Sequence, residues 1–414
     1  MTGNSADTEL SEQGFRPLLK IRQYRLIWGV RVAWTVAIQM LFVAVSWHMY
    51  ELTNDAWALG LVGLLQFLPV LILTLPAGHF VDKWNRARII TGCLIAQAVL
   101  AALLVAGAAT HTLSKDLLLL ASLGLGASRA FQMPAVQAFV PGTVPSSLLT
   151  RAMAAASTGS QMSVILGPTL GGFLLAYGIE VVYAVVTALF VAAIVLSLRL
   201  RQPEIARKHY NSSLSSLLSG IHFVWRRKVV LGAMTLDVFA VLFGSAVALL
   251  PIYAKDILHV GPAGLGWLHA GPAIGAFSMA LYLVHHPMKS RIGRTLLICV
   301  GLYGLATIVF GVSTSFMLSM AALIITGACD MVSVVIRQTL VQLETPDDMR
   351  GRVSAVNSVF IGASNQLGEF ESGAAAALIG PVGAVALGGA ATCLLALMWP
   401  KLFPDLARRA RFEK

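Results

Sequence analysis

Long apolar runs dominate this sequence and restrict the folds open to it. Each run is close to the roughly 20 residues that a helix needs to cross a hydrocarbon layer about 30 Å thick. Lipid offers no hydrogen-bond partners to backbone amides, and the runs lack the alternating pattern of an outer-membrane barrel, so each is predicted to be a helix. The runs lie at about 24–50, 57–79, 88–110, 116–141, 150–177, 179–199, 229–254, 264–285, 294–313, 315–342, 352–378 and 380–403. The predicted fold class is an all-α membrane protein with twelve transmembrane helices.

The composition agrees with that reading. Of the 414 residues, 57% are hydrophobic and 12% are charged, against roughly 25% charged residues in an average soluble domain. The first run is too long, and too polar at its start, for a cleaved signal peptide, and no small-residue cleavage site follows it. We therefore expect it to remain as the first transmembrane helix.

The net charge of +11 reflects membrane topology. Of 30 Lys and Arg residues, 25 lie in the two termini and in the loops after the even-numbered helices. The other loops hold only Lys115 and Lys255. This asymmetry follows the positive-inside rule, so both termini and the 200–228 linker are predicted to face the cytoplasm. The basic charge therefore does not indicate nucleic-acid binding.

No motif indicates an enzyme, a cofactor or a metal. The four cysteines lie inside predicted helices without CxxC spacing, which favours packing roles. P-loop, GxSxG, HExxH and paired-metal spacings are missing from the sequence, so ATP coupling within this chain is not expected.

The chain contains a duplication. A shift of 201 positions places GASR at 126–129 on GACD at 327–330, and LGPTLGG at 166–172 on LGEFESG at 367–373. Repeated halves related by an axis along the membrane normal typically enclose a site at their interface near the midplane. The predicted organisation is a cytoplasmic N-terminal segment (1–23), a six-helix bundle (24–199), a cytoplasmic linker (200–228), a second six-helix bundle (229–403) and a cytoplasmic tail (404–414).

Four stretches resemble the major facilitator superfamily. PAGHFVDKWNRARII at 76–90 is similar to its loop signature between the second and third helices, and GSQMSVILGPTLGG at 159–172 resembles the fifth-helix signature of its exporters. Residues 49–69 and 347–373 resemble its bacterial enterobactin-exporter-like branch. The resemblance implies a cavity lined by the first, fourth, seventh and tenth helices. It also implies that the second, fifth, eighth and eleventh helices form the contact between the halves.

The first-loop signature implies a conformational latch made of Asp82, Lys83, Arg86 and Arg88. A carboxylate held against arginines and a helix terminus can stabilise one conformation, and breaking that contact frees the halves to rock. The alternative is that the basic residues only anchor topology. Asn85 stands where the signature has glycine, which is a departure from the family pattern.

The fifth-helix signature contains small residues and a proline. Small residues let helices approach closely, and a proline removes one backbone hydrogen bond. The resemblance to exporters implies that this segment helps to shut the leak between cytoplasm and outside, whereas plain helix packing is the alternative. The motif consists of Gly159, Gly167, Pro168, Gly171 and Gly172.

Ionisable residues inside the predicted helices are candidates for substrate binding. A charge at the centre of a membrane helix costs about 2.5–3.5 kcal/mol on insertion scales, so it usually faces a partner or a wet cavity. The duplication makes Arg129 and Asp330 equivalent positions of opposite charge, and they could instead simply neutralise each other. The predicted substrate-binding residues are Arg31, Gln39, Arg129, Asp237, Asp330 and Arg337.

Two glutamates in the eleventh apolar run are candidates for proton coupling. Glu369 shares a helical face with Asn365 and Ser372, whereas Glu371 points about 160° away at 100° per residue. A carboxyl group in a low-dielectric site holds its proton more readily than one in water. We expect Glu369 to carry the coupling proton, with Asp237 and then Glu371 as the other candidates.

The predicted function is a proton-driven exporter that works by alternating access. The arginines near the cavity suggest an anionic cargo, and the resemblance implies a siderophore-like compound. Broad drug efflux is the runner-up, and a membrane sensor or a lipid-moving protein is a further alternative. The expected location is the bacterial inner membrane, the expected partners are the small-molecule substrate, protons and the lipid bilayer, and the expected state is a monomer.

Overall fold

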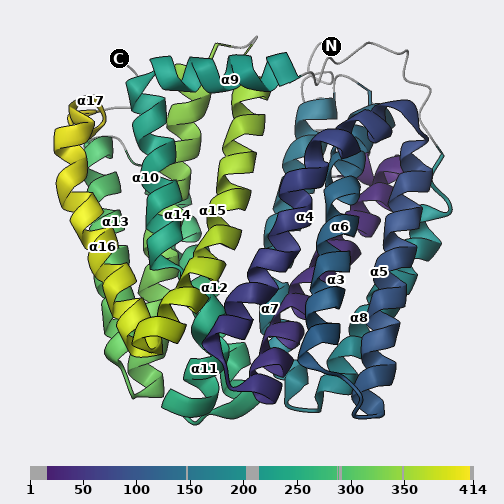
Figure 1. Ribbon diagram of the computed structural model, residues 1–414. Coiled ribbons are helices and arrows are strands. Elements are labelled where there is room, and N and C mark those ends of the chain that lie inside the picture. The colour runs from purple at the N-terminus through teal and green to yellow at the C-terminus, as the bar shows by residue number, and fades with distance from the viewer. Residues whose placement is uncertain are drawn as a thin grey trace, which may run out of the picture. The chain divides into compact units, whose positions relative to one another are not determined.

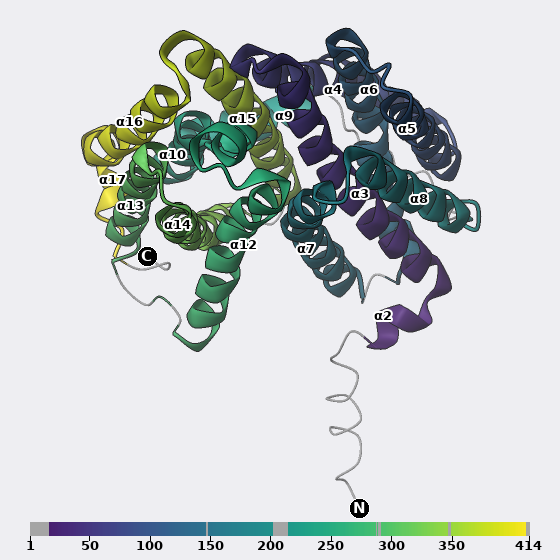
Figure 2. The ribbon, with the colours of Figure 1, turned by 90° about the horizontal axis from the view of Figure 1, so that it is seen from below.

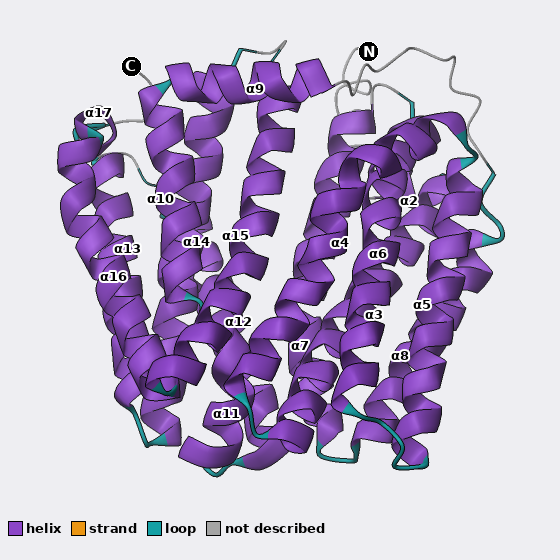
Figure 3. Ribbon diagram, in the orientation of Figure 1, coloured by secondary structure: helices purple, strands orange, loops and turns teal. Residues whose placement is uncertain are grey.

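The computed structural model describes residues 16–145, 148–201, 214–286, 288, 291–346 and 349–410. Within these ranges all regular secondary structure is helical (Figure 3). The chain forms two compact units, Met1–Ala44 with Leu68–His209, and Val45–Phe67 with Tyr210–Lys414. Parts of the predicted N-terminal segment, linker and tail lie outside the described residues, namely 1–15, 202–213 and 411–414.

Apart from the linker between α8 and α9, the helices follow one another with short connections (Figure 1). Up to residue 201 the helices are α2 (Arg16–Lys20), α3 (Arg22–Thr53), α4 (Ala56–Lys83), α5 (Arg86–Ala109), α6 (Lys115–Phe139), η1 (Val140–Thr143), α7 (Leu149–Leu175) and α8 (Ile179–Ser197). The rest of the chain contains α9 (Leu214–Arg226), α10 (Lys228–Gly244), η3 (Val247–Leu249), α11 (Leu250–Ile252), η4 (Tyr253–Ile257), α12 (Gly261–His285), α13 (Ile292–Val312), α14 (Phe316–Glu344), α15 (Arg350–Ile379), α16 (Pro381–Leu402) and α17 (Pro404–Ala407).

Each of the twelve predicted spans corresponds to a helix or to consecutive helical segments. In the described part of the chain, nine segments are long and apolar enough to cross a membrane. The remaining three spans are α6, α7 and α15, which are as long but richer in small and polar residues. The seventh span runs from α10 through a π-helical segment, η4, at its end. The prediction of an all-α membrane protein with twelve spans is confirmed.

In the first unit, α7 packs along α3 through glycines and polar contacts. Hydroxyl and indole groups of α3 donate to α7 carbonyls, from Tyr24 to Ala152 at 2.8 Å and from Trp28 to Ala155 at 3.1 Å. A Cβ added to Gly167 would lie 3.2 Å from the Val36 carbonyl oxygen. The glycines therefore bring the two backbones close together, as small residues do in membrane helices.

In the second unit, α14 lies between α12 and α13, as the end-on view shows (Figure 2). Gly275 and Gly327 bring α12 and α14 together, because a Cβ at either position would collide with the facing backbone of Ile324 or Pro272. Gly304 does the same between α13 and α16, where a Cβ would lie 2.7 Å from the carbonyl oxygen of Gly389.

The end of α3 and the start of α4 belong to the second unit. A Cβ added to Gly373 of α15 would lie 2.5 Å from the Cα of Gly60 in α4, and Trp57 meets Phe370 edge-on with ring centroids 5.6 Å apart. The compact units therefore divide within α3 and α4, between residues 44 and 45 and between 67 and 68. The division of the chain into two six-helix bundles, 24–199 and 229–403, remains a prediction.

Helix α9 crosses the ends of α10 and α15 (Figure 1). Its buried Val224 packs with Val230 of α10 and with Val353 and Val356 of α15. The tail is fastened to the same unit, because Arg409 pairs with Glu344 of α14 at 2.6 Å. The α9 part of the linker and the described part of the tail are thus anchored on the second unit, whereas at the start of the linker the backbone N–H of Arg201 donates to the Gln23 side chain of the first unit at 3.0 Å.

Candidate functional site

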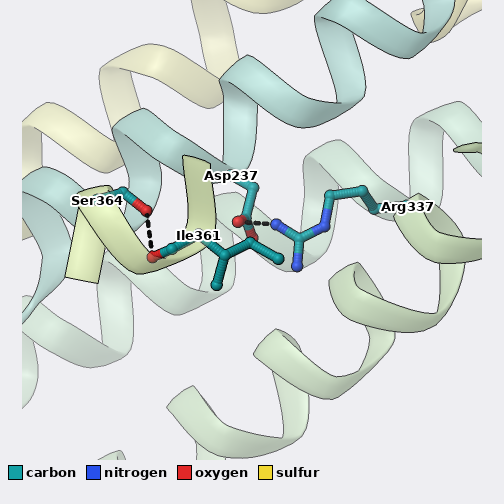
Figure 4. A network of polar contacts seen from close by, with 4 residues as sticks. All are labelled: Asp237, Arg337, Ile361 and Ser364. Carbon is teal, nitrogen blue, oxygen red and sulfur yellow. Dashed lines mark hydrogen bonds and ion pairs between the residues drawn. The ribbon is translucent and has the colours of Figure 1, made fainter. Parts of the chain in front are cut away.

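A buried ion pair joins α10 and α14. The guanidinium of Arg337 contacts the carboxylate of Asp237, and the two side chains are 4% and 6% exposed (Figure 4). The Nε of Arg337 has no hydrogen-bond partner among the described atoms. A buried pair with an unsatisfied donor is a costly arrangement, so it is more typical of a functional site than of a purely structural contact.

A small cavity of about 20 Å³ adjoins this ion pair. Asp237 lines it together with Asp330 and Ser333 of α14 and Tyr303 of α13, whose hydroxyl donates to the Gly244 carbonyl at 3.1 Å. A cavity needs about 10–15 Å³ to hold one water molecule, so this one has room for a water beside these polar side chains, in walls that Ala240, Val241 and Val300 complete. The structure thus brings together the three predicted binding residues of the second unit.

Glu369 lies where α15 meets the start of α4. A Cβ added to Gly63 would lie 3.2 Å from both Cβ and Oε2 of Glu369, and the neighbouring Gln66 is 3% exposed. One turn further along α15, Ser372 donates to the Ser245 carbonyl at 2.7 Å. The carboxyl group therefore stands between a helix of the N-terminal sequence half and one of the C-terminal half.

The other three predicted binding residues belong to the first unit. Arg31 of α3 donates through Nε to the hydroxyl of Ser160 in α7 at 2.6 Å. Gln39 packs beside Gly167, because a Cβ added there would lie 2.5 Å from the Cβ of Gln39. Arg129 is partly buried in α6. An approach of Arg129 to Asp330 remains a prediction, because the two residues belong to different units.

The predicted latch lies around the junction of α4 and α5. Asp82 is in the last turn of α4, and its side chain is outside the described part of the structure. The Arg86 guanidinium donates to the Ala138 carbonyl in the last turn of α6 at 2.9 Å, while Lys83 and Arg88 are exposed. A cation at the end of a helix is favourable because the last carbonyls lack intrahelical partners.

Asn85, the departure from the family signature, caps α5. Its side-chain oxygen accepts a hydrogen bond from the backbone N–H of Arg88 at 3.2 Å. Asparagine is among the preferred N-cap residues, so its presence has a local structural reason.

The sequence reasoning missed a polar cluster at the end of α3 and η4. Tyr50 donates a hydrogen bond to the Asp256 carboxylate, and Lys255 donates to the Asn54 side chain at 2.7 Å. The ammonium of Lys255 also lies 5.3 Å from the centre of the Tyr50 ring. The adjacent charges of Lys255 and Asp256 at the end of an apolar run were the available signal, but their partners lie about 200 residues away in the chain, beyond any local pattern.

A larger but open surface groove, of about 460 Å³, lies between α5 and α8. Its walls are alanine and valine side chains and one threonine, Thr187, so it offers no charged group to recognise a polar cargo. Among the described residues no group of three His, Cys, Asp or Glu side chains could hold a metal ion. Of the groove and the cavity, it is therefore the cavity beside the ion pair that has the ionisable walls.

Buried ionisable residues within membrane-spanning helices are costly, and they are typical of membrane proteins that bind or move ions and polar solutes. A family model described as the Major Facilitator Superfamily matches residues 27–369, and the chain belongs to this family. It is accordingly a multi-pass membrane transporter of small molecules and not an enzyme.

Similar proteins cover nearly the whole chain. The enterobactin exporter EntS of Citrobacter koseri is 24% identical over 396 residues, which are 93% of this chain and 92% of the relative. The multidrug efflux pump Tap of Mycobacterium tuberculosis is 27% identical over 397 residues, 90% of this chain and 92% of the relative.

Solved structures show the same fold. A bacterial homologue of the human lysosomal transporter Spinster, inward-facing and unoccupied, matches with a TM-score of 0.70 at 15% identity, over 94% of this chain and 97% of that chain. A variant of the nucleoside transporter NupG matches with a TM-score of 0.67 at 13% identity, over 92% of this chain and 100% of that chain. At these identities the likeness shows the fold alone.

Proposed function

We propose that this transporter exports a small polar or amphipathic organic anion, a siderophore-like compound, in exchange for protons by alternating access. The observation that carries the proposal is the placement of arginines within membrane-spanning helices. Arg31 is bonded to a neutral serine hydroxyl, which leaves its positive charge without neutralisation by that contact. An arginine in a low-dielectric site binds carboxylates strongly and with defined geometry. The similarity to an enterobactin exporter supports the same cargo class.

Protons are the proposed driving ion, and Glu369 is the proposed carrier. Its carboxyl group stands against Gly63, at a contact between helices that alternating access has to loosen. A change in its charge would alter the stability of that contact, which is what couples a proton to a conformational change. Asp237 is the next candidate and Glu371 the third.

The test of proton coupling is Glu369→Gln. Glutamine keeps the shape and the hydrogen bonding of the neutral acid but cannot titrate. We expect the variant to lose uphill export driven by a pH gradient in proteoliposomes while keeping part of its downhill exchange. If gradient-driven export survives in Glu369→Gln and fails in Asp237→Asn, the proton carrier is on α10.

Broad drug efflux is the second candidate, and the similarity to the multidrug efflux pump Tap favours it. The two functions differ in what the arginines do. A drug pump would move lipophilic cations and would tolerate the loss of Arg129, whereas an anion exporter would not. Flux of a catecholate siderophore and of a cationic dye, measured in the same proteoliposomes, separates the two.

The proposed exporter has a defined orientation in the membrane, and its flux distinguishes it from a sensor and from a lipid-moving protein. Both termini and the 200–228 linker are placed in the cytoplasm, the bacterial inner membrane is the proposed location, and the monomer is the proposed working unit. A sensor would show no flux under any gradient, and a lipid-moving protein would transfer labelled phospholipid between leaflets. Either result in the reconstituted protein would replace the exporter proposal.

A further inference from the structure

The cluster around the α10–α14 ion pair contains more negative than positive charge. Asp237 and Asp330 line the same cavity, which has a volume of about 20 Å³, and Arg337 is the arginine that contacts one of them. Two carboxylates that share a confined site disfavour each other's ionisation, and one guanidinium can neutralise only one of them. The count leaves one negative charge too many for a site inside membrane-spanning helices.

Asp330 is the less buried of the two carboxyl groups. Asp237 is 5% exposed and already paired, whereas Asp330 is only partly buried and also lines the cavity. Asp330, Ser333 and Arg337 follow one another at helical spacing on α14, so they share a face. Long side chains in a helix lean toward its start, which for Arg337 is the direction of Asp330.

The other ionisable groups of the second unit near this site lie on α12, α13, α14 and α15. Gly327 of α14 packs on Pro272 of α12. On α12, His269 lies one turn before Pro272, and on α14, Asp330 lies one turn beyond Gly327. His269 and Asp330 are therefore about 9 Å apart along the helix axes. On α15, Glu369 is held against Gly63 of α4. The ionisable or polar groups that line the cavity with Asp330 are Asp237 from α10, Cys299 and Tyr303 from α13, and Cys329 and Ser333 from α14. None of these adds a second positive charge.

We propose that Asp330 is a proton-binding site, neutral while Asp237 is paired with Arg337. On release of its proton to water, Asp330 competes with Asp237 for the guanidinium of Arg337. The step moves one proton and exchanges one ion-pair partner, and it needs no other reactant. In transport this site would be a second protonatable position beside Glu369, a role that rests on the proposed proton coupling.

Infrared spectroscopy of the full-length protein in lipid nanodiscs tests the site without any transport measurement. A protonated carboxyl group gives a C=O stretching band that is absent from the carboxylate. We expect the parent protein to show such a band at neutral pH and to lose it on alkalinisation. Asp330→Asn should remove the part of the band that belongs to Asp330, and because asparagine mimics the neutral acid, the variant should fold normally.

Asp237→Asn is the decisive second variant. It leaves Asp330 intact but removes the competing carboxylate, so Arg337 can neutralise Asp330 and the proton is no longer required. We therefore expect the Asp330 band to vanish at neutral pH in Asp237→Asn. Glu369→Gln is the matched control and should keep it.

A band that is undiminished in Asp330→Asn would overturn the assignment, as would a band that is undiminished in Asp237→Asn. The outcome is separable from that of the proposed function. Gradient-driven export with no Asp330 band leaves the exporter proposal standing and refutes this site. The expected band pattern without gradient-driven export would support this proton site and refute the proposal of a proton-driven exporter.

Discussion

Removing Arg337 tests whether its contact with Asp237 holds the second unit together. In Arg337→Gln the amide keeps much of the side-chain volume but carries no charge. The Asp237 carboxylate then stays in a site where it is 5% exposed and has lost its cationic partner. The variant therefore replaces a compensated buried charge by an uncompensated one.

The expected loss follows from the burial. An exposed ion pair contributes about 0–1 kcal/mol, whereas breaking a buried pair by removing one partner costs about 3–5 kcal/mol. With side chains 4% and 6% exposed, the pair belongs to the buried class. We expect the free energy of unfolding to fall by about 3–5 kcal/mol, and we expect Arg337→Gln with Asp237→Asn to recover most of it because no buried charge remains.

Unfolding in mixed detergent micelles, followed by tryptophan fluorescence, measures these differences. Trp399 is a suitable reporter, because its indole donates to the Gly232 carbonyl of α10 at 3.0 Å. Glu344→Ala is the matched control, since it breaks the more exposed pair with Arg409, whose side chains are 12% and 16% exposed. A loss below about 1 kcal/mol in Arg337→Gln, or a double variant no more stable than the single one, would refute the reasoning.

Three further outcomes test the function and the topology. Asp82→Asn should insert and fold normally but transport roughly ten-fold more slowly, since it removes a conformational contact worth about 1–3 kcal/mol; unchanged flux would eliminate the latch. A cysteine placed at Ser213 should react with a maleimide only after the membrane is permeabilised, and labelling of intact cells by an impermeant reagent would reverse the assigned orientation. Arg129→Ala should weaken export of an anionic cargo by about ten-fold or more and spare a neutral one, because a hydrogen bond to a charged group is worth about 1.5–3 kcal/mol. Equal loss for both cargoes would favour pairing of Arg129 with Asp330. A double variant with the two charges exchanged should then restore export.

The helices were predictable because the hydrocarbon layer leaves few alternatives. A run of apolar residues near 20 long has to be helical in lipid, so all twelve runs correspond to helices within a few residues. The break of the seventh span into α10, η3, α11 and η4 was not predictable. It depends on local backbone geometry at residues 245–257, where the apolar pattern itself continues.

The site was predictable in part. Hydropathy identifies which residues are costly to bury, and so it selected Asp237, Asp330 and Arg337. It does not say which of them pair, because pairing is decided by the rotation of α10 against α14. For the same reason the contacts of Tyr50 with Asp256 and of Asn54 with Lys255 had no counterpart in the sequence analysis.

The duplication explains why Glu369 stands at a contact between helices. In α7, Gly167 packs against the backbone of the first span, and in α15 the equivalent Gly368 packs against the seventh, where a Cβ would lie 3.0 Å from the Val241 carbonyl oxygen. The next residue in each helix is rotated by 100°, away from that partner and toward another neighbour. This position is Pro168 in the first copy and Glu369 in the second, where the neighbour is Gly63 of α4. An acid could be accommodated there because glycine leaves room for its side chain.

Gly63→Ala should consequently disturb the Glu369 carboxyl group, since the new Cβ would lie 3.2 Å from Oε2. If this variant and Glu369→Gln impair gradient-driven export together while Gly362→Ala, where a Cβ would meet nothing within 4 Å, does not, the proton carrier is at this contact.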